Sequence, residues 1–318
     1  MLFLLTVSIF TLRLYFRVTC GVCKSARDMS GKVVVVTGGN TGIGKELVRD
    51  LAKRNAKIIL GCRSIERGRE AMLDVMESTG NTNIYVKRCD MSSLQSVRMF
   101  CEDVLDSEDR LDVLVCFAGS GAPFGRHLTE DGVEMQFATN HLGHFLLVNL
   151  LLDLMKCTPN SRIVITSSSA HLLGSMDLSN ITRFDKYISH PFVAYCNTKL
   201  ANIMFMKELS ERLENTGVCV NALHPGTIYT NGIRHNKIWY IKLFLTFLSF
   251  LYNKSLEEGA QTLIYLSVSE EVDGVSGQYF TDCRQAKYNP LADDSSLRRE
   301  LWSVSAQLCD SQLKKSLL

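Results

Sequence analysis

The sequence predicts an α/β fold in which one doubly wound parallel sheet carries helices on both faces. From Gly31 onward, short β-branched apolar runs alternate with longer amphipathic segments, as is typical of parallel strands joined by crossover helices. The first apolar run ends in a glycine-rich turn. No internal repeat or low-complexity linker interrupts the series, so we expect one domain over residues 31–289 and a tail over 290–318.

The elements follow one another in a regular order. Runs rich in Val and Ile predict strands, and amphipathic runs of ten residues or more predict helices. The strands are expected at Val33–Thr37, Lys57–Gly61, Asn83–Cys89, Leu111–Cys116, Arg162–Ser167 and Val218–Leu223. The clearest helices are expected at Gly44–Arg54, Ser93–Asp106, Val133–Met155 and Phe192–Leu213.

Two apolar segments stand outside this order. Residues 1–18 are mostly apolar, with Arg13 and Arg17 late in the run, which favours a membrane anchor over a cleaved signal peptide and a domain facing the cytosol. The run is shorter than the roughly 20 residues that a spanning helix needs, so an interfacial helix is the alternative. Residues 238–252 are apolar on nearly every face, which predicts either a buried helix or a substrate lid or membrane-dipping insertion.

Charge, cysteine content and the surroundings of two histidines argue against a nucleic-acid-binding, disulfide-rich or metal-binding protein. The chain has 318 residues, 35 basic and 33 acidic side chains and a net charge of +2, so no nucleic-acid partner is expected. Its 11 cysteines are scattered singly apart from Cys20 and Cys23, which favours a reducing compartment over a disulfide framework. His141 and His144 have no recognisable carboxylate or thiol partner, so no metal is expected.

The first predicted strand leads into TGGNTGIGKE, Thr37 to Glu46. Gly38, Gly42 and Gly44 let the backbone approach a pyrophosphate, and the free N–H groups of the following helix favour its charge. This is a Rossmann-type turn. We expect it to bind a dinucleotide through its three glycines and through Asn40, Thr41 and Ile43.

Two further side chains indicate which dinucleotide. Arg63 follows the second strand, at the place where an acidic residue commonly meets a free ribose 2′-hydroxyl. Because a guanidinium pairs with a 2′-phosphate, Arg63 favours NADP(H). Asp90 ends the third strand, where it is placed to accept from an adenine amino group or to cap the helix that Ser92 or Ser93 begins.

Tyr195 and Lys199 are the strongest candidates for chemistry. Their spacing of four residues puts the phenol and the ammonium group on one helical face. A nearby cation stabilises phenolate, so we expect Lys199 to lower the pKa of Tyr195 from its usual value near 10. Ser168 precedes this pair at the end of the fifth strand, and His224-Pro225-Gly226 follows it.

Together the TGGNTGIGK run, Asp90, Asn140 in TNHLGHF, the Ser168 run, YCNTK and HPGT resemble the short-chain dehydrogenase/reductase family over roughly residues 31–283. The runs GCRS, SSSAH, NTKLANIMF, NALHPG and GQYFTDC resemble its retinol dehydrogenase branch. The chain departs from the family in having Cys116-Phe117 before Ala118-Gly119, where two asparagines are usual, and in having Gly39 where alanine is usual.

The resemblance implies a role for each matching residue. It makes Tyr195 the general acid/base, Ser168 the group that orients the substrate oxygen, Lys199 the holder of the nicotinamide ribose and Asn140 the support of a proton relay. It adds four residues to the cofactor site: Ala118, Gly119, Pro225 and Thr227. It also implies a homodimer through the helix from Val133 and the helix that carries Tyr195.

The expected function is NADP(H)-dependent interconversion of a lipophilic aldehyde or ketone and its alcohol, with retinal and retinol first. The alternatives are a steroid or fatty-aldehyde reductase, or a cofactor-binding membrane protein with little turnover, which the Cys116-Phe117 departure motivates. The expected location is the endoplasmic reticulum membrane, with lipid droplets and mitochondria as alternatives.

Overall fold

The computed structural model describes Thr11 and residues 19–121, 128–178, 191–226 and 254–316, with side chains up to Asp310. The predicted anchor, apart from Thr11, lies outside the described residues, as do the apolar segment 238–252 and Thr227. Within the described part of the chain, no helix has both the length and the apolar character needed to span a bilayer.

One sheet of eight strands forms the centre of the described structure, in the order β3-β2-β1-β4-β5-β6-β7-β8. Strands β1 to β7 pair in parallel, and β8 pairs antiparallel with β7. The strands are β1 Val33–Thr37, β2 Lys57–Cys62, β3 Ile84–Arg88, β4 Val113–Cys116, β5 Arg162–Thr166, β6 Cys219–His224, β7 Gln278–Thr281 and β8 Arg284–Gln285. The predicted parallel sheet and its six strands are confirmed, whereas β7 and β8 were not predicted.

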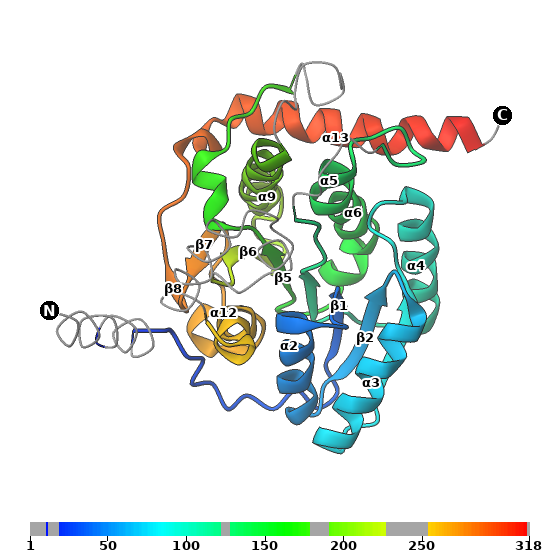
Figure 1. The fold of residues 1–318 in the computed structure, drawn as a ribbon, viewed down its shortest axis with the longest axis vertical. Helices are drawn as coiled ribbons and strands as arrows, with labels where there is room; N and C mark the ends of the chain where they lie inside the picture. The colour runs from blue at the N-terminus through cyan, green and yellow to red at the C-terminus, as the bar shows by residue number, and fades with distance from the viewer. Residues whose placement is uncertain (1–10, 12–18, 122–127, 179–190, 227–253, 317–318) are drawn as a thin grey trace, which may run out of the picture.

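Helices cover both faces of this sheet (Figure 1). One face carries α4, α6 and α9 over a core that includes Leu114 and Leu147. The other carries α2, α3 and α12 over a core that includes Val34 and Leu263. The helices are α2 Gly42–Lys53, α3 Ile65–Thr79, α4 Leu94–Ser107, α6 Gly143–Lys156, α9 Pro191–Arg212 and α12 Leu256–Val268.

The sheet changes winding direction between β1 and β4. The chain runs outward from β1 through β2 to β3, then returns to the other side of β1 and continues through β4, β5, β6 and β7. Thr37 and Cys116, the last residues of β1 and β4, lie opposite each other in the ladder. A crevice for a ligand is expected beyond such adjacent carboxyl ends, because the flanking connections diverge to opposite faces.

The predicted helix Val133–Met155 is interrupted by a wider turn. It consists of α5 (Met135–Phe137), a π-helical segment over Ala138–Leu142 and α6. Segments of this kind are rare and often occur at functional sites. The segment contains Asn140, whose main-chain carbonyl accepts from two side chains, as described below.

The residues after Asn289 fold back onto the sheet-covering helices. They form the short 3-10 helix η4 (Pro290–Asp293) and the long helix α13 (Ser295–Ser316). Figure 1 shows α13 crossing the outer side of α9. Leu301 of α13 is 2% exposed, so this helix contributes to the core.

Candidate active site

A cavity of about 640 Å³ opens at the carboxyl ends of the central strands. It is lined by residues of the β1–α2 turn, the ends of β2 to β6 and the start of α9. The predicted site residues that line it are Gly38, Asn40, Thr41, Ile43, Arg63, Asp90, Ala118, Gly119, Ser168, Tyr195, Lys199 and Pro225. Gly42, Gly44 and Asn140 do not line the cavity, and Thr227 falls outside the described residues.

The glycine turn has no room for side chains at its close approaches. Gly38 has φ +72°, and a Cβ there would lie 2.8 Å from the Ala118 Cα. A Cβ on Gly44 would lie 2.9 Å from the Phe117 ring. Helix α2 then begins at Gly42, and the Thr41 side chain makes no capping hydrogen bond to it. Its first N–H groups can therefore serve an anion in the cavity.

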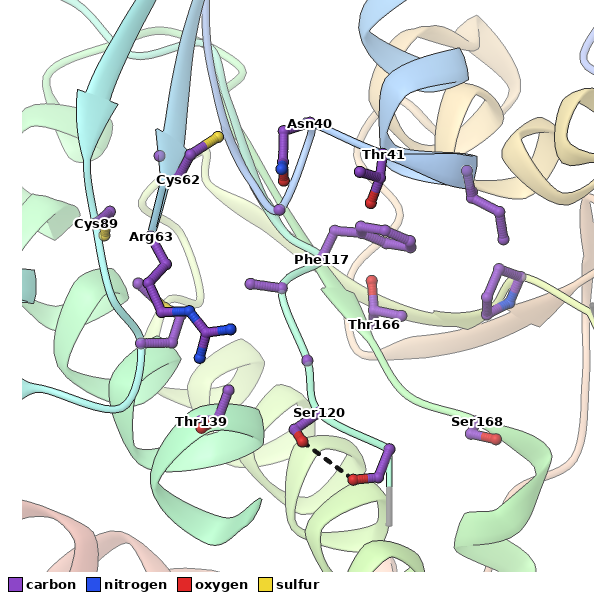
Figure 2. A pocket seen from close by; sticks show the side chains of 18 of the residues that line it. Asn40, Thr41, Cys62, Arg63, Cys89, Phe117, Ser120, Thr139, Thr166 and Ser168 are labelled. Atoms are coloured by element: carbon purple, nitrogen blue, oxygen red, sulfur yellow. Dashed lines mark hydrogen bonds between the residues drawn. The ribbon is translucent and has the colours of Figure 1, made fainter. Parts of the chain in front are cut away.

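Thr37 ties the turn to the end of β4. Its hydroxyl oxygen accepts from the N–H groups of Phe117 at 3.0 Å and Ala118 at 3.1 Å, and lies 2.9 Å from Nε2 of His144. Phe117 stands where the family that the sequence resembles usually has an asparagine, and its ring projects between Thr41 and Thr166 (Figure 2). The main-chain bonds to Thr37 thus hold β4 in place at the Cys116-Phe117 departure.

Positive charge gathers at one end of the cavity. The guanidinium of Arg63 points into it (Figure 2), and Arg67, in the first turn of α3, also lines it. Arg67 was not predicted, although its position four residues after Arg63 is a usable signal once a helix is expected there. Asp90 accepts from the N–H and hydroxyl of Ser92 at 3.0 and 2.7 Å through one oxygen, while Ser93 caps α4.

Ser168, Tyr195 and Lys199 come together at the other end of the cavity. Tyr195 is half-buried; burial raises the pKa of its phenol, and a hydrogen bond with Ser168 opposes that rise. The Lys199 ammonium donates to the Thr166 carbonyl at 3.3 Å and lies 5.6 Å from the centre of the Tyr195 ring. Burial lowers the pKa of Lys199 to about 8.

The predicted direction of the Tyr195 pKa shift is therefore wrong. We expected Lys199 to lower that pKa, but the phenol pKa is raised. The physical reason is that desolvation outweighs the other influences on Tyr195, while the ammonium group is directed to a main-chain oxygen.

Asn140 acts behind the cavity wall. Its side chain is fully buried, and its Oδ1 accepts from the Ser120 N–H at 2.7 Å. Its Nδ2 donates to the Ser120 carbonyl at 3.0 Å and to the Thr198 hydroxyl at 3.1 Å. Asn140 thereby joins the loop after β4 to the helix that carries Tyr195 and Lys199.

Thr166 and His224 are polar lining residues that were not predicted as site residues from the sequence. The Thr166 hydroxyl and Nδ1 of His224 are buried atoms without a hydrogen-bond partner among the described residues. Burial lowers the pKa of His224 to about 4. His224 stands in the HPG run, which is the signal that could have found it, whereas Thr166 is one of several strand-end hydroxyls.

Comparison with known protein families identifies the family to which this chain belongs. The model of the short chain dehydrogenase family matches residues 32–240. The chain belongs to the short-chain dehydrogenase family. It falls in the retinol dehydrogenase-like branch, as the following relatives show.

Retinol dehydrogenase 13 of Homo sapiens is 44% identical over 296 residues, which cover 92% of this chain and 88% of that protein. Retinol dehydrogenase 11 of Mus musculus is 40% identical over 291 residues, which cover 91% and 89%. Retinol dehydrogenase 14 of Homo sapiens is 42% identical over 292 residues, which cover 87% and 86%. This short-chain dehydrogenase is thus similar to them over nearly its whole length.

Solved structures share the fold. An uncharacterized protein from Mycobacterium Paratuberculosis is 30% identical with a TM-score of 0.73, covering 91% of this short-chain dehydrogenase and 98% of that chain. L-Sorbose reductase from Gluconobacter frateurii, complexed with NADPH and L-sorbose, is 23% identical with a TM-score of 0.65, covering 80% and 96%. The second likeness is one of fold alone.

Proposed function

We propose that this short-chain dehydrogenase is an NADP(H)-dependent oxidoreductase that interconverts a lipophilic aldehyde or ketone and its alcohol, with retinal and retinol as the first pair to test. One observation carries the proposal. A single cavity joins a phosphate-binding turn and Arg63 at one end to Ser168, Tyr195 and Lys199 at the other.

The residues present fit a nicotinamide dinucleotide. The close approaches at Gly38 and Gly44 leave no room for side chains in the turn, and the uncapped start of α2 offers its first N–H groups to a pyrophosphate. Arg63 and Arg67 provide cationic donors for a 2′-phosphate. When bound, the nicotinamide supplies or accepts the hydride. L-Sorbose reductase, a protein of the same fold, is described as complexed with NADPH.

The chain's own residues move the proton. In the reducing direction, the Tyr195 hydroxyl donates its proton to the substrate oxygen, and Ser168 donates a hydrogen bond that orients that oxygen. The raised pKa keeps Tyr195 protonated, so the proton is present, but it also makes the phenol a weaker acid. In the oxidising direction Tyr195 must accept a proton, and the charge of Lys199 then stabilises the phenolate that forms.

The surroundings of Ser168 and Tyr195 support a lipophilic substrate. Leu172 and Leu173 follow Ser168 in the chain and are 54% and 71% exposed. Phe192 and Val193 precede Tyr195 and are 46% and 42% exposed. Exposed apolar side chains beside a site favour apolar ligands or surfaces. The names of the similar retinol dehydrogenases make retinoids the first substrates to test.

We propose further that residues 1–18 attach the protein to a membrane, with the domain in the cytosol and the endoplasmic reticulum as the first location. The described stretch after this segment is bound to the domain: the Gly21 N–H donates to Asp282, and the Cys23 N–H donates to Gln261. The chain just after residues 1–18 is therefore held against the domain. A homodimer stays a proposal, and its face would include α13 because this helix covers α9.

The proposal is tested by NADPH oxidation with all-trans-retinal, comparing the wild type with Tyr195→Phe. Loss of the proton donor is expected to lower kcat by about 10²-fold or more, in line with the usual contribution of general acid catalysis. The matched control is Tyr265→Phe on α12, which removes a hydroxyl bonded to Glu271 outside the cavity lining. Equal turnover by the wild type and Tyr195→Phe would overturn the proposed role of Tyr195.

A second candidate is a cofactor-binding protein with little turnover. It is favoured by Phe117, whose ring stands in the cavity where the family has an asparagine. A wild type that binds NADPH but turns over no retinal, steroid ketone or fatty aldehyde would support this candidate. If the protein turned over only a steroid or a fatty aldehyde, the proposed mechanism would stand and the proposed substrate would be wrong.

A further inference from the structure

Asn202 makes three hydrogen bonds that link α9 to two functional segments. Its Nδ2 donates at 3.0 Å to the Asn140 carbonyl in the π-helical segment and at 3.0 Å to the Thr166 carbonyl at the end of β5. Its Oδ1 lies 3.3 Å from Nδ1 of His141. Asn202 is 2% exposed, so water does not compete for these bonds.

These contacts fix the tautomer of His141. Both Nδ2 hydrogens of Asn202 are directed at carbonyl oxygens, so its Oδ1 must accept and Nδ1 of His141 must donate. Nε2 of His141 is then an acceptor, and it lies 3.1 Å from the Ser305 hydroxyl of α13, which donates. The ring is 1% exposed and lies 5.0 Å, centre to centre, from the Phe137 ring. His141 is therefore a neutral side chain that joins Asn202 on α9 to Ser305 on α13 in one fixed orientation.

The chain of hydrogen bonds ends at the catalytic lysine. The Thr166 carbonyl that accepts from Asn202 also accepts from the Lys199 ammonium. Both donors lie on α9, so the position of this carbonyl sets the distance of the ammonium group from the cavity. The second carbonyl held by Asn202 belongs to Asn140, whose side chain anchors the loop after β4.

We propose that Asn202, oriented by His141 and Ser305, is a positioning residue that holds the Thr166 and Asn140 carbonyls and thereby places Lys199 for catalysis. The inference rests on the proposed function. It gives α13 a part in the active site, since Ser305 supplies the last donor of the series.

The test compares kcat, KM and NADPH affinity among four variants. Asn202→Leu removes all three bonds, and His141→Leu removes both ring contacts. His141→Asn keeps a donor where Nδ1 stands, and Ser305→Ala removes only the outer donor. We expect kcat to fall about 10²-fold in Asn202→Leu and about tenfold in His141→Leu, with KM for the aldehyde nearly unchanged, because small displacements of catalytic groups cost this much. His141→Asn should recover most of the loss, and Ser305→Ala should lose about threefold.

The control variant is Thr158→Val. The Thr158 hydroxyl is buried between the Leu111 N–H and the Leu154 carbonyl, away from the cavity lining. This variant should lower Tm and leave kcat unchanged. The inference is overturned if the Asn202 and His141 variants lose no more kcat than Thr158→Val does for the same loss of Tm, and if His141→Asn restores no activity. Asn202 would then have a structural role only.

Two further readouts keep the inference testable whatever the substrate. A histidine ring ¹H–¹⁵N spectrum should show His141 as the Nδ1–H tautomer; the Nε2–H tautomer would overturn the inference. Fluorescence titration should show that Asn202→Leu binds NADPH about tenfold more weakly than the wild type. His141→Asn should bind NADPH more tightly than His141→Leu.

The outcomes separate the inference from the proposed function. If the wild type binds NADPH but reduces no aldehyde, the proposed function fails. Unchanged NADPH affinity in Asn202→Leu would overturn the inference. If Asn202→Leu does not fold, Ser305→Ala and the His141 pair decide the same question.

Discussion

At the scale of single residues, burial governs the charge of the histidines behind the cavity. Burial lowers the pKa of His144 to about 3 and that of His141 to about 4. His144 also lies 2.9 Å from the Thr37 hydroxyl and 3.4 Å from the Asn140 carbonyl, so it packs at the join of β1, β4 and the π-helical segment. A protonated ring in this position would add an unpaired charge to the core.

We therefore expect stability to fall as the pH is lowered from 7 to 5. Below pH 6.5, the ordinary value for histidine, the unfolded chain binds protons at His144, whereas the native ring stays neutral to about pH 3. Each such histidine contributes a slope of up to about 1.4 kcal/mol per pH unit in this window and none above it. In urea unfolding at pH 7, 6 and 5, His144→Gln should lose stability less steeply than the wild type. Parallel curves for the two proteins would contradict this assignment.

A second residue-scale prediction concerns Arg63. If its guanidinium binds the 2′-phosphate, Arg63→Ala should weaken NADPH binding roughly 10- to 100-fold, the worth of a charge-assisted hydrogen bond, and leave NADH binding unchanged. Fluorescence titration of both dinucleotides measures this. Arg69→Ala is the control, because Arg69 is exposed on α3 but does not line the cavity. Equal weakening of both dinucleotides by Arg63→Ala would argue against selection through the 2′-phosphate.

At the scale of elements, α13 depends on one aromatic anchor. The Trp302 ring lies 4.9 Å from the Phe145 ring on α6 and 5.8 Å from the Phe205 ring on α9. The Arg212 guanidinium lies 4.1 Å from the centre of the same indole. Arg298, 4% exposed, adds ion pairs with Glu208 and Glu211.

Trp302→Ala should destabilise the protein by about 2–4 kcal/mol, because it removes a large aromatic from a packed helix junction, although Trp302 keeps part of its surface exposed. Urea unfolding measures the change. Leu105→Ala on α4 is the control, since Leu105 is 45% exposed and should change stability by less than about 1 kcal/mol. A Trp302 variant as stable as that control would mean that α13 docks mainly through its ion pairs.

At the scale of the whole molecule, the sequence predicts the central sheet better than its edges. Strands buried on both faces form nearly continuous apolar runs, and Val33–Thr37 and Arg162–Thr166 show such a run with every residue buried. By contrast, β7 has four residues and its two ends are less buried than its centre. Helix α13 buries Leu301, Ser305 and Cys309 at four-residue intervals. That stripe is narrow and partly polar, so hydrophobic periodicity did not reveal it.

The same contrast holds for the site. Gly38, Arg63, Ser168, Tyr195 and Lys199 were predicted because each stands in a motif or at a strand end with a chemical reason for its residue type. The hydrogen bonds among His141, Asn202 and Ser305 could not be predicted in this way. Their partners are 61 and 164 residues apart in the chain, and only the packing of three helices brings them together.

The strand order also has a consequence for synthesis on the ribosome. From β4 to β7, each new strand joins the edge left by the one before it, so the sheet can grow in the order in which the chain emerges. Translation is slow compared with the folding of small units, and domains fold as their residues appear. Among the described elements, α13, which carries Ser305, emerges after all the strands of the sheet. The described cavity lining can therefore form before α13 emerges, and under the proposed role of Ser305 the position of Lys199 is set only when α13 packs on α9.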